Sequence, residues 1–212
     1  MHNPWLNVSA ADYEGHMHSP EVDQLSMLSR LLGEDLAAFR PRELLLPGCA
    51  TGNGLSEVDP AVTRRVVAVD IHPAYLDELR RRYPDPGFDL QVFCADVMTH
   101  DFGEEAFDLV HCALLLEYVD WPQLLPVLSR SLRPGGVLGI VLQRPSVAHP
   151  AVTPTRFASL GQLEQLFRFV DPVALAERAR DCGLALESQR TVTLPSGKAF
   201  AVGRYRRAIA AG

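Results

Sequence analysis

The feature that most restricts the fold is a series of short apolar runs separated by segments with helical spacing. Two of these runs, 43–47 and 64–70, are apolar without alternation, which is typical of strands buried on both faces of a parallel sheet. Further strands are expected at 88–96, 106–115 and 137–143. Strands that alternate with helices imply right-handed βαβ units. This part of the chain therefore predicts a parallel sheet covered by helices.

The last third of the chain follows a different pattern. Prolines break a loop between 145 and 154, and helical segments are expected near 160–170 and 172–182. Two strand-like segments, 184–194 and 198–207, then flank Pro-Ser-Gly, which is a hairpin signal. We therefore predict an α/β protein with a Rossmann-like, doubly wound seven-stranded sheet, mostly parallel and with a C-terminal antiparallel hairpin.

The N-terminal region divides into two parts. Ser19-Pro20-Glu21 predicts the start of a helix, because a hydroxyl can cap the first turn and proline fits there. Leucines at helical spacing carry this helix to about Phe39. The preceding residues 1–18 lack a clear periodicity and the apolar core of a signal peptide.

Composition disfavours several classes of protein. The chain is 47% hydrophobic and 22% charged, which suits a folded domain with a sizeable core. Its net charge is −6, whereas nucleic-acid-binding surfaces are usually basic, so no nucleic-acid partner is expected. The four cysteines lack metal-ligand spacing, which predicts no metal site and a reducing, cytoplasmic location. No apolar run is long enough to span a bilayer, so no membrane partner is expected.

A glycine-rich loop, Pro-Gly-Cys-Ala-Thr-Gly-Asn-Gly, follows the first expected strand. Such a loop lies at the carboxyl edge of a parallel sheet, where ligands bind. Its spacing is not the G-x-G-x-x-G of dinucleotide sites, and the Gly-Lys-Ser/Thr of a phosphate loop is missing. Asp70, about 20 residues further on, suits hydrogen bonding to ribose hydroxyls. Asp96 ends the third strand, where a carboxylate could accept from an adenine amine, so a nucleoside ligand is favoured.

The region 43–143 resembles the class I S-adenosylmethionine-dependent methyltransferases, in particular their small-molecule branch. Five segments carry the resemblance in the family's order: LLLPGCATGNG, VVAVDIHPAYL, FCADVMTHDF, FDLVHCALLLEYV and LRPGGVLGIVL. The terminal hairpin also matches, since the family's seventh strand runs antiparallel between the fifth and sixth. The resemblance implies S-adenosyl-L-methionine as cofactor and transfer of a methyl group to a small-molecule acceptor by direct displacement.

The resemblance also implies which residues bind the cofactor. Asp70 would hold the ribose, Asp96 and Val97 would face the adenine edge, and backbone near Ala113 would pass close to the sulfonium. The full expected set is Tyr13, Gly48, Cys49, Ala50, Gly52, Asn53, Asp70, Ile71, Asp96, Val97 and Ala113.

Three parts of a single domain follow from this interpretation. Residues 1–40 form an N-terminal lid and helix, 41–144 the cofactor-binding core, and 145–212 the substrate-side helices and hairpin. Residues 1–18 are expected to be mobile and to order over the cofactor. Apolar side chains of the last part could wall an acceptor pocket: Phe157, Leu160, Leu163, Leu166, Phe167 and Phe169.

Two positions depart from the family pattern. Leu46 stands where the family usually has an acid that contacts the methionine amino group indirectly, and Ala50 stands where it usually has glycine. We expect Tyr13, His16 or His18 to supply polar contacts in place of the missing acid.

Methyl transfer does not require a strong catalytic residue, because the cofactor supplies reactivity and the protein supplies alignment. A general base would assist a hydroxyl or ammonium acceptor. His16, His111 and Tyr118 are the candidates, and Glu117 is expected to be a polar tether rather than a base.

The sequence also bears on three other interpretations. An NAD-dependent oxidoreductase conflicts with the glycine spacing, and the sequence has no Tyr-x-x-x-Lys pair. DNA adenine methylation is disfavoured, because His-Cys-Ala-Leu stands where such enzymes often carry Asn/Asp-Pro-Pro-aromatic. A cofactor-binding domain without transfer activity, acting through partners, stays open because of Leu46 and Ala50.

Overall fold

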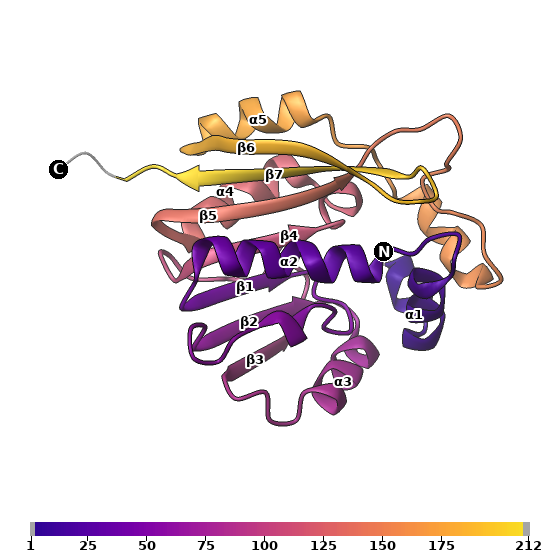
Figure 1. Ribbon diagram of the computed structural model, residues 1–212, viewed down its shortest axis with the longest axis horizontal. Coiled ribbons are helices and arrows are strands. Elements are labelled where there is room, and N and C mark those ends of the chain that lie inside the picture. Colours follow the sequence, from indigo (N-terminus) through magenta and orange to yellow (C-terminus); the bar gives the residue numbers. More distant parts are fainter. Residues whose placement is uncertain (1–2, 210–212) are drawn as a thin grey trace.

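The computed structural model describes residues 3–209 (Figure 1). Its strands form one seven-stranded sheet in the order β3-β2-β1-β4-β5-β7-β6. They are β1 (Glu43–Pro47), β2 (Arg65–Asp70), β3 (Asp89–Cys94), β4 (Phe107–Ala113), β5 (Leu132–Gln143), β6 (Leu184–Thr193) and β7 (Ala199–Arg207). The first five strands are parallel, and β7 pairs antiparallel with both β5 and β6. The predicted fold class is confirmed, including the insertion of β7 between β5 and β6.

Helices cover both faces of this sheet. The α-helices are α1 (Ala10–His18), α2 (Leu25–Phe39), α3 (Pro73–Arg82), α4 (Trp121–Ser131) and α5 (Pro172–Asp181). Short 3₁₀ helices are η1 (Pro4–Asn7), η2 (Leu55–Glu57), η3 (Leu116–Tyr118) and η4 (Ala158–Gln165). α2 lies in front of the strands in Figure 1, and its Leu32 and Leu36 share a buried cluster with Leu79 of α3. α4 and α5 cover the opposite face.

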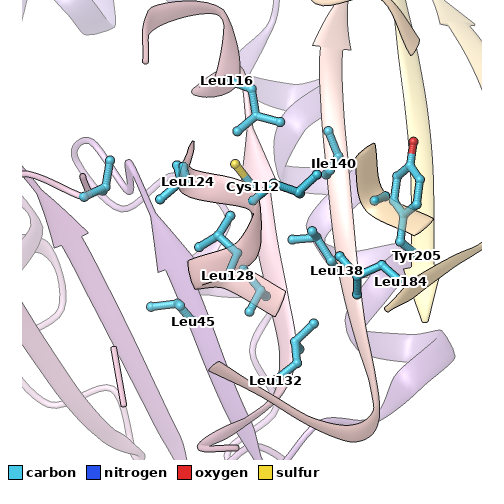
Figure 2. Close-up of a cluster of buried hydrophobic side chains, with 14 of the residues drawn as sticks. Leu45, Cys112, Leu116, Leu124, Leu128, Leu132, Leu138, Ile140, Leu184 and Tyr205 are labelled. Carbon is cyan, nitrogen blue, oxygen red and sulfur yellow. The ribbon is translucent and has the colours of Figure 1, made fainter. Parts of the chain in front are cut away.

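The cluster under α4 explains how the sheet is held on that face. Figure 2 shows Leu124 and Leu128 of α4 packed toward Leu45, Leu138 and Ile140 of the strands. Burial of each such side chain contributes roughly 1.5–3 kcal/mol. Side chains on both faces of the central strands are therefore buried, and the carboxyl ends of these strands are held in fixed positions.

The predicted helix start at Ser19 is wrong. Residues 10–18 already form α1, whose first turn is capped by the Ser9 side chain, and α2 begins only at Leu25. Ser19 is extended (φ −60°, ψ 146°), as expected for a residue before proline, and its hydroxyl donates to the His16 carbonyl. The Ser-Pro pair therefore ends one helix and does not begin the next.

The predicted helix at 160–170 is also wrong in type and length. The chain there forms the 3₁₀ helix η4, which ends at Gln165. The Arg168 N–H donates to the carbonyl of Glu117 at 2.8 Å, so it is not available to continue a helix. Leu160 and Leu163 are still buried, as their spacing suggested, but they pack on Val8 of the N-terminal region.

η1 and α1 together make a cover at the carboxyl ends of the strands. In Figure 1 the indigo α1 lies beside the orange segment that includes η4. Ser159 of η4 donates to Asp12 of α1 at 2.5 Å, and Asn7 bonds Gln162 at 3.3 Å. The placement expected for a lid is present, and its mobility stays a prediction.

Across residues 3–209, each helix is too short or too polar to pass through a membrane.

Candidate active site

A cavity of about 150 Å³, the main cavity, lies at the carboxyl ends of β1, β2 and β4 beneath the cover. The structure brings most of the expected ligand residues into its lining: Tyr13, Gly48, Ala50, Asp70, Ile71, Asp96, Val97 and Ala113. A side hollow of about 60 Å³ shares Tyr13, Gly48, Ala50 and Ala113 and adds Cys49 and Asn53. Together these residues form a floor supplied by strand ends and a roof supplied by the N-terminal segment.

Gly52 is the expected residue that lines neither space. A side chain there would come within 2.9 Å of Leu79 and 3.1 Å of Leu55, and the backbone has φ +83°. Glycine is therefore required at this position by packing and by backbone conformation. Its expected role as a direct contact is not supported by its place in the fold.

Ala50 adopts the left-handed conformation that glycine usually provides, with φ 45°. This conformation costs a non-glycine residue roughly 1–2 kcal/mol. The Ala50 N–H donates to Asp70 Oδ2 at 2.9 Å, so the loop keeps its shape through this hydrogen bond. The methyl group lies in the lining of both the main cavity and the side hollow.

Asp70 joins the glycine loop to the next turn. Oδ2 accepts from Ala50 and Oδ1 accepts from the His72 N–H, each at 2.9 Å. Burial raises the pKa of the Asp70 carboxyl, and these backbone hydrogen bonds lower it in part. Each carboxylate oxygen can accept a second hydrogen bond, so Asp70 can also receive donors from the main cavity.

Asp96 is exposed at the rim of the main cavity. Its Oδ1 accepts from the Met98 N–H at 2.9 Å, which closes the turn after β3. Neighbouring Val97 is buried and Ile71 is half-buried, and both line the main cavity together with Asp96. Two apolar side chains and an exposed acid suit a flat aromatic group that carries a donor at its edge.

Two aromatic side chains that the sequence did not single out as ligands, Trp5 and Tyr75, line the main cavity beside Tyr13 and Tyr118. The ring centroids of Trp5 and Tyr118 lie 5.0 Å apart, and those of Tyr13 and Tyr75 lie 5.2 Å apart. The Tyr75 hydroxyl is buried and has no hydrogen-bond partner in the described part of the chain. The spacing of Tyr75 indicated only a packed helix face, and Trp5 had no periodic signal at all.

The three candidate bases lie in different places. His111 lines the side hollow, and its Nδ1 is 2.8 Å from Asp35 Oδ2. Tyr118 lines the main cavity, and burial raises the pKa of its hydroxyl. His16 lies outside the main cavity, with Nδ1 3.0 Å from Thr155 Oγ1, and burial lowers its pKa to about 4. His18 is exposed and bonds the Glu14 carbonyl, so it lines neither space.

Glu117 is a tether in the structure. Its Oε1 accepts from the Gln143 N–H at 2.7 Å, which ties η3 to the end of β5. Burial raises its carboxyl pKa to about 7.

Nowhere between residues 3 and 209 do three His, Cys, Asp or Glu side chains gather as a metal site would require.

A third space of about 50 Å³, the Lys198 pocket, adjoins the main cavity and shares Trp5, Leu114 and Tyr118 with it. Of the side chains expected to wall an acceptor pocket, Leu160, Leu163 and Phe167 line it. Phe157 instead packs over Gly15, and Phe169 is exposed. Gln24 and Lys198, which line the Lys198 pocket, were not anticipated from the sequence.

Comparison with known proteins gives a family match for the central sheet. Residues 45–140 match a family described as "Methyltransferase domain". A trans-aconitate 2-methyltransferase of Variovorax paradoxus is 36% identical over 44% of this chain and 35% of that protein. A malonyl-[acyl-carrier protein] O-methyltransferase of Halorhodospira halophila is 27% identical over 76% of this chain and 56% of that protein. The chain thus spans only about a third to a half of the length of these curated relatives.

Solved structures share the fold over a longer stretch. The N-methyltransferase NodS from Bradyrhizobium japonicum, in complex with S-adenosyl-L-homocysteine, has a TM-score of 0.67 and 17% identity over 89% of this chain and 88% of that one. The [4+2]-cyclase SpnF has a TM-score of 0.67 and 16% identity over 86% of this chain and 80% of that one. At these identities the likeness shows the fold alone.

Proposed function

We propose that the chain is an S-adenosylmethionine-dependent methyltransferase acting on a small molecule, on the basis of the class I fold and of the match between residues 45–140 and the methyltransferase domain family. The observation that carries the proposal is the composition of the main cavity. Three groups line this cavity: the glycine loop with its left-handed Ala50, the buried Asp70 carboxylate, which can accept further hydrogen bonds, and the apolar Ile71 and Val97 together with the Asp96 carboxylate. These groups fit a nucleoside joined to an amino acid, and they fit a diphosphate poorly.

The roles of the floor residues follow from their positions. We propose that Asp70 accepts from the ribose hydroxyls, while Ile71 and Val97 enclose the adenine and Asp96 accepts from its amine. Each of these residues lies directly at or after the end of a parallel strand, so the sheet sets their relative positions.

At the amino-acid end, we propose that His111 takes the place of the acid missing at Leu46. Both side chains line the side hollow with Cys49 and Asn53. Asp35 is buried, lies 2.8 Å from His111 Nδ1, and accepts from Arg204 Nε at 2.7 Å. A carboxylate at Nδ1 favours the tautomer in which Nε2 is an acceptor. His111 Nε2 can then accept a hydrogen bond from the ammonium group of the cofactor, which would replace part of the role of the acid usually found at position 46.

The bound cofactor would supply a methyl group, which would pass directly from its sulfonium to the nucleophilic atom of the acceptor and leave S-adenosylhomocysteine. The protein's contribution is alignment and exclusion of water. Trp5, Tyr13 and Met17 of the N-terminal segment enclose the main cavity on the side away from the strands. Tyr118 stands between the main cavity and the Lys198 pocket, where it can orient an acceptor.

One second candidate has a specific observation in its favour. The strained Ala50 and the apolar Leu46 are departures at the methionine end, and one structural neighbour is a [4+2]-cyclase. A domain that binds the cofactor without transferring its methyl group is therefore the alternative.

The four cysteines, all free, support a reducing, cytoplasmic location.

A turnover assay separates the two candidates. The protein is incubated with methyl-labelled S-adenosylmethionine and a panel of small acids, amines, thiols and phenols, and label transfer is measured together with S-adenosylhomocysteine. Transfer to one chemical class supports the methyltransferase. Tight cofactor binding with no transfer to any class supports the alternative.

A further inference from the structure

The Lys198 pocket is lined by polar side chains as well as by apolar ones. Polar side chains from four separate parts of the chain meet there: His16 of α1, Gln24 before α2, Gln143 at the end of β5, and Lys198 at the β6–β7 turn. Trp5, Leu114 and Tyr118 form a wall between this pocket and the main cavity. A molecule that reaches both spaces must pass this wall.

Lys198 is the only lysine in the sequence, and only 3% of it is exposed. Its ammonium donates to Thr153 Oγ1 at 3.2 Å, which uses one of its three protons. None of the ion pairs formed within residues 3–209 includes it, so no carboxylate lies within 4.0 Å. Burial lowers its pKa to about 8, and Glu117 at longer range opposes this shift.

A buried ammonium without a direct counter-ion is costly, since several kcal/mol of hydration are lost. Buried charges in proteins are normally paired. Lys198 therefore has the properties of a group whose partner comes from outside the chain.

Two further side chains offer unused hydrogen-bonding groups. Gln24 is 4% exposed; its backbone N–H donates to the Met17 carbonyl, but its side-chain amide has no hydrogen-bond partner between residues 3 and 209. His16 uses Nδ1 toward Thr155, which leaves Nε2 without a partner in the same part of the chain. Gln24, His16 and Lys198, whose side chains keep unused hydrogen-bonding capacity, thus line one small space beside the main cavity.

The size of the Lys198 pocket limits the ligand group. Its volume of about 50 Å³ exceeds the roughly 15 Å³ that one water needs, and it is smaller than the main cavity, so it suits a small group of a larger ligand. A planar group with two acceptor oxygens matches both the room and the donors. A doubly charged phosphate would be bulkier and would carry more negative charge than the single cation in the lining, Lys198, can offset.

We propose that the Lys198 pocket is an acceptor subsite that binds a carboxylate group of the methyl acceptor, with Lys198 as its counter-ion. The assignment to an acceptor rests on the proposed methyltransferase function, and the carboxylate binding does not. The acceptor is then a small carboxylic acid whose nucleophilic atom lies on the Tyr118 side of its bound carboxylate, toward the main cavity.

The single lysine allows a direct test by NMR. Protein labelled with ¹³C at the lysine ε-carbon gives one lysine side-chain signal, which is followed during titration with malonate, acetate, acetamide and inorganic phosphate. The titrations are run with and without S-adenosylhomocysteine. We expect saturable shifts of this signal with the two carboxylates and none with acetamide.

Two variants provide the comparison. Lys198→Met keeps the unbranched chain up to the ε-carbon and removes the ammonium. It should weaken malonate binding, measured by calorimetry, by about 10- to 100-fold, the loss expected for a charged hydrogen bond. Lys198→Arg keeps the charge and should retain more of the affinity. Binding of S-adenosylhomocysteine should be unchanged in both variants, which also shows that they are folded.

The outcomes are distinct for the two proposals. If wild-type protein fails to bind S-adenosylhomocysteine, the proposed function is wrong, while the carboxylate titration still tests the pocket. If S-adenosylhomocysteine binds but neither carboxylate shifts the lysine signal, the subsite is wrong. A shift with phosphate alone would also overturn the carboxylate assignment.

Discussion

The floor of the main cavity and its cover are built in different ways. The floor consists of residues at or just after strand ends, such as Asp70 at the end of β2 and Asp96 after β3, and hydrogen bonds from backbone N–H groups to their carboxylates fix them. The cover consists of η1 and α1, which are joined to η4 mainly by side-chain contacts such as Ser159 with Asp12. The floor is therefore set by the fold, whereas the cover depends on packing and can differ between proteins that share the fold.

Deletion of residues 1–18 tests this contrast most severely and should have the largest effect. It removes Trp5, Tyr13 and Met17 from the main cavity while leaving every strand intact. Cofactor affinity should fall by about 100-fold, the loss expected when the burial of one large apolar side chain, roughly 1.5–3 kcal/mol, is lost. Calorimetry with S-adenosylhomocysteine measures this loss, and circular dichroism checks the sheet.

Hydrogen exchange of the intact protein addresses the mobility of the same segment. The backbone amides of α1 should exchange more slowly when S-adenosylhomocysteine is added. Slow exchange that does not change on cofactor addition would mean that the cover is fixed structure and not a lid.

Asp70→Ala should have the next largest effect and tests the floor. Cofactor affinity should fall by about 10- to 100-fold, because a hydrogen bond to a charged group contributes roughly 1.5–3 kcal/mol. Stability should also fall, since the Ala50 and His72 N–H groups lose their acceptor. Asp70→Asn keeps one acceptor oxygen and should lose less of both. Unchanged cofactor affinity in Asp70→Ala would restrict Asp70 to a structural role.

The substitution Glu117→Gln tests the buried tether between η3 and the end of β5 through the pH dependence of protein stability. Burial raises the folded-state pKa of Glu117 from 4.5 to about 7, so the native state holds a proton that the unfolded chain has lost. Wild-type stability should therefore fall with rising pH across this window, by about 1.4 kcal/mol per pH unit from this group. The stability advantage of Glu117→Gln over wild type should grow between pH 4.5 and 7 and stay constant above pH 7.

Denaturant titrations at several pH values give this difference directly, and exposed Glu104→Gln is the matched control. His16 acts in the opposite direction, because its folded pKa of about 4 makes the native state lose stability as pH falls below 6.5. The comparison with wild type cancels that contribution. A difference that does not vary with pH would contradict the buried state of Glu117.

Ala50→Gly should give the smallest effect. It relieves a left-handed alanine at φ 45°, which favours folding by roughly 1–2 kcal/mol, but glycine adds unfolded-state freedom worth about 0.4–1 kcal/mol. The net change in stability, measured by thermal unfolding, should lie between zero and about 1.6 kcal/mol in favour of glycine. A clear loss of stability would show that the methyl group packs favourably in the loop.

The sequence predicted the floor because parallel strands place their carboxyl ends at one edge. The apolar runs located β1 and β2, and Asp70 and the glycine loop then had to meet there. Gly52 was expected as a contact but serves packing against Leu79, which is a tertiary contact that spacing does not reveal.

The cover could not be predicted in the same way. Ser19-Pro20 is compatible with a helix start or a helix end, and only the extended Ser19 and the capped α1 show which one is used. Lys198 lies far along the chain from His16, and the tertiary fold alone brings them to one pocket. The sequence did contain a signal for Lys198, because it is the single lysine of the chain and lies at a predicted tight turn.

The most direct test of the whole account is a calorimetric titration of the wild-type protein with S-adenosylhomocysteine and with NAD. We predict binding of S-adenosylhomocysteine at one site with a dissociation constant on the order of micromolar, together with a rise in melting temperature, because the ligand binds only the native state. NAD should neither bind nor stabilise the protein. Binding of NAD, or no binding of S-adenosylhomocysteine, would contradict the assignment of the main cavity.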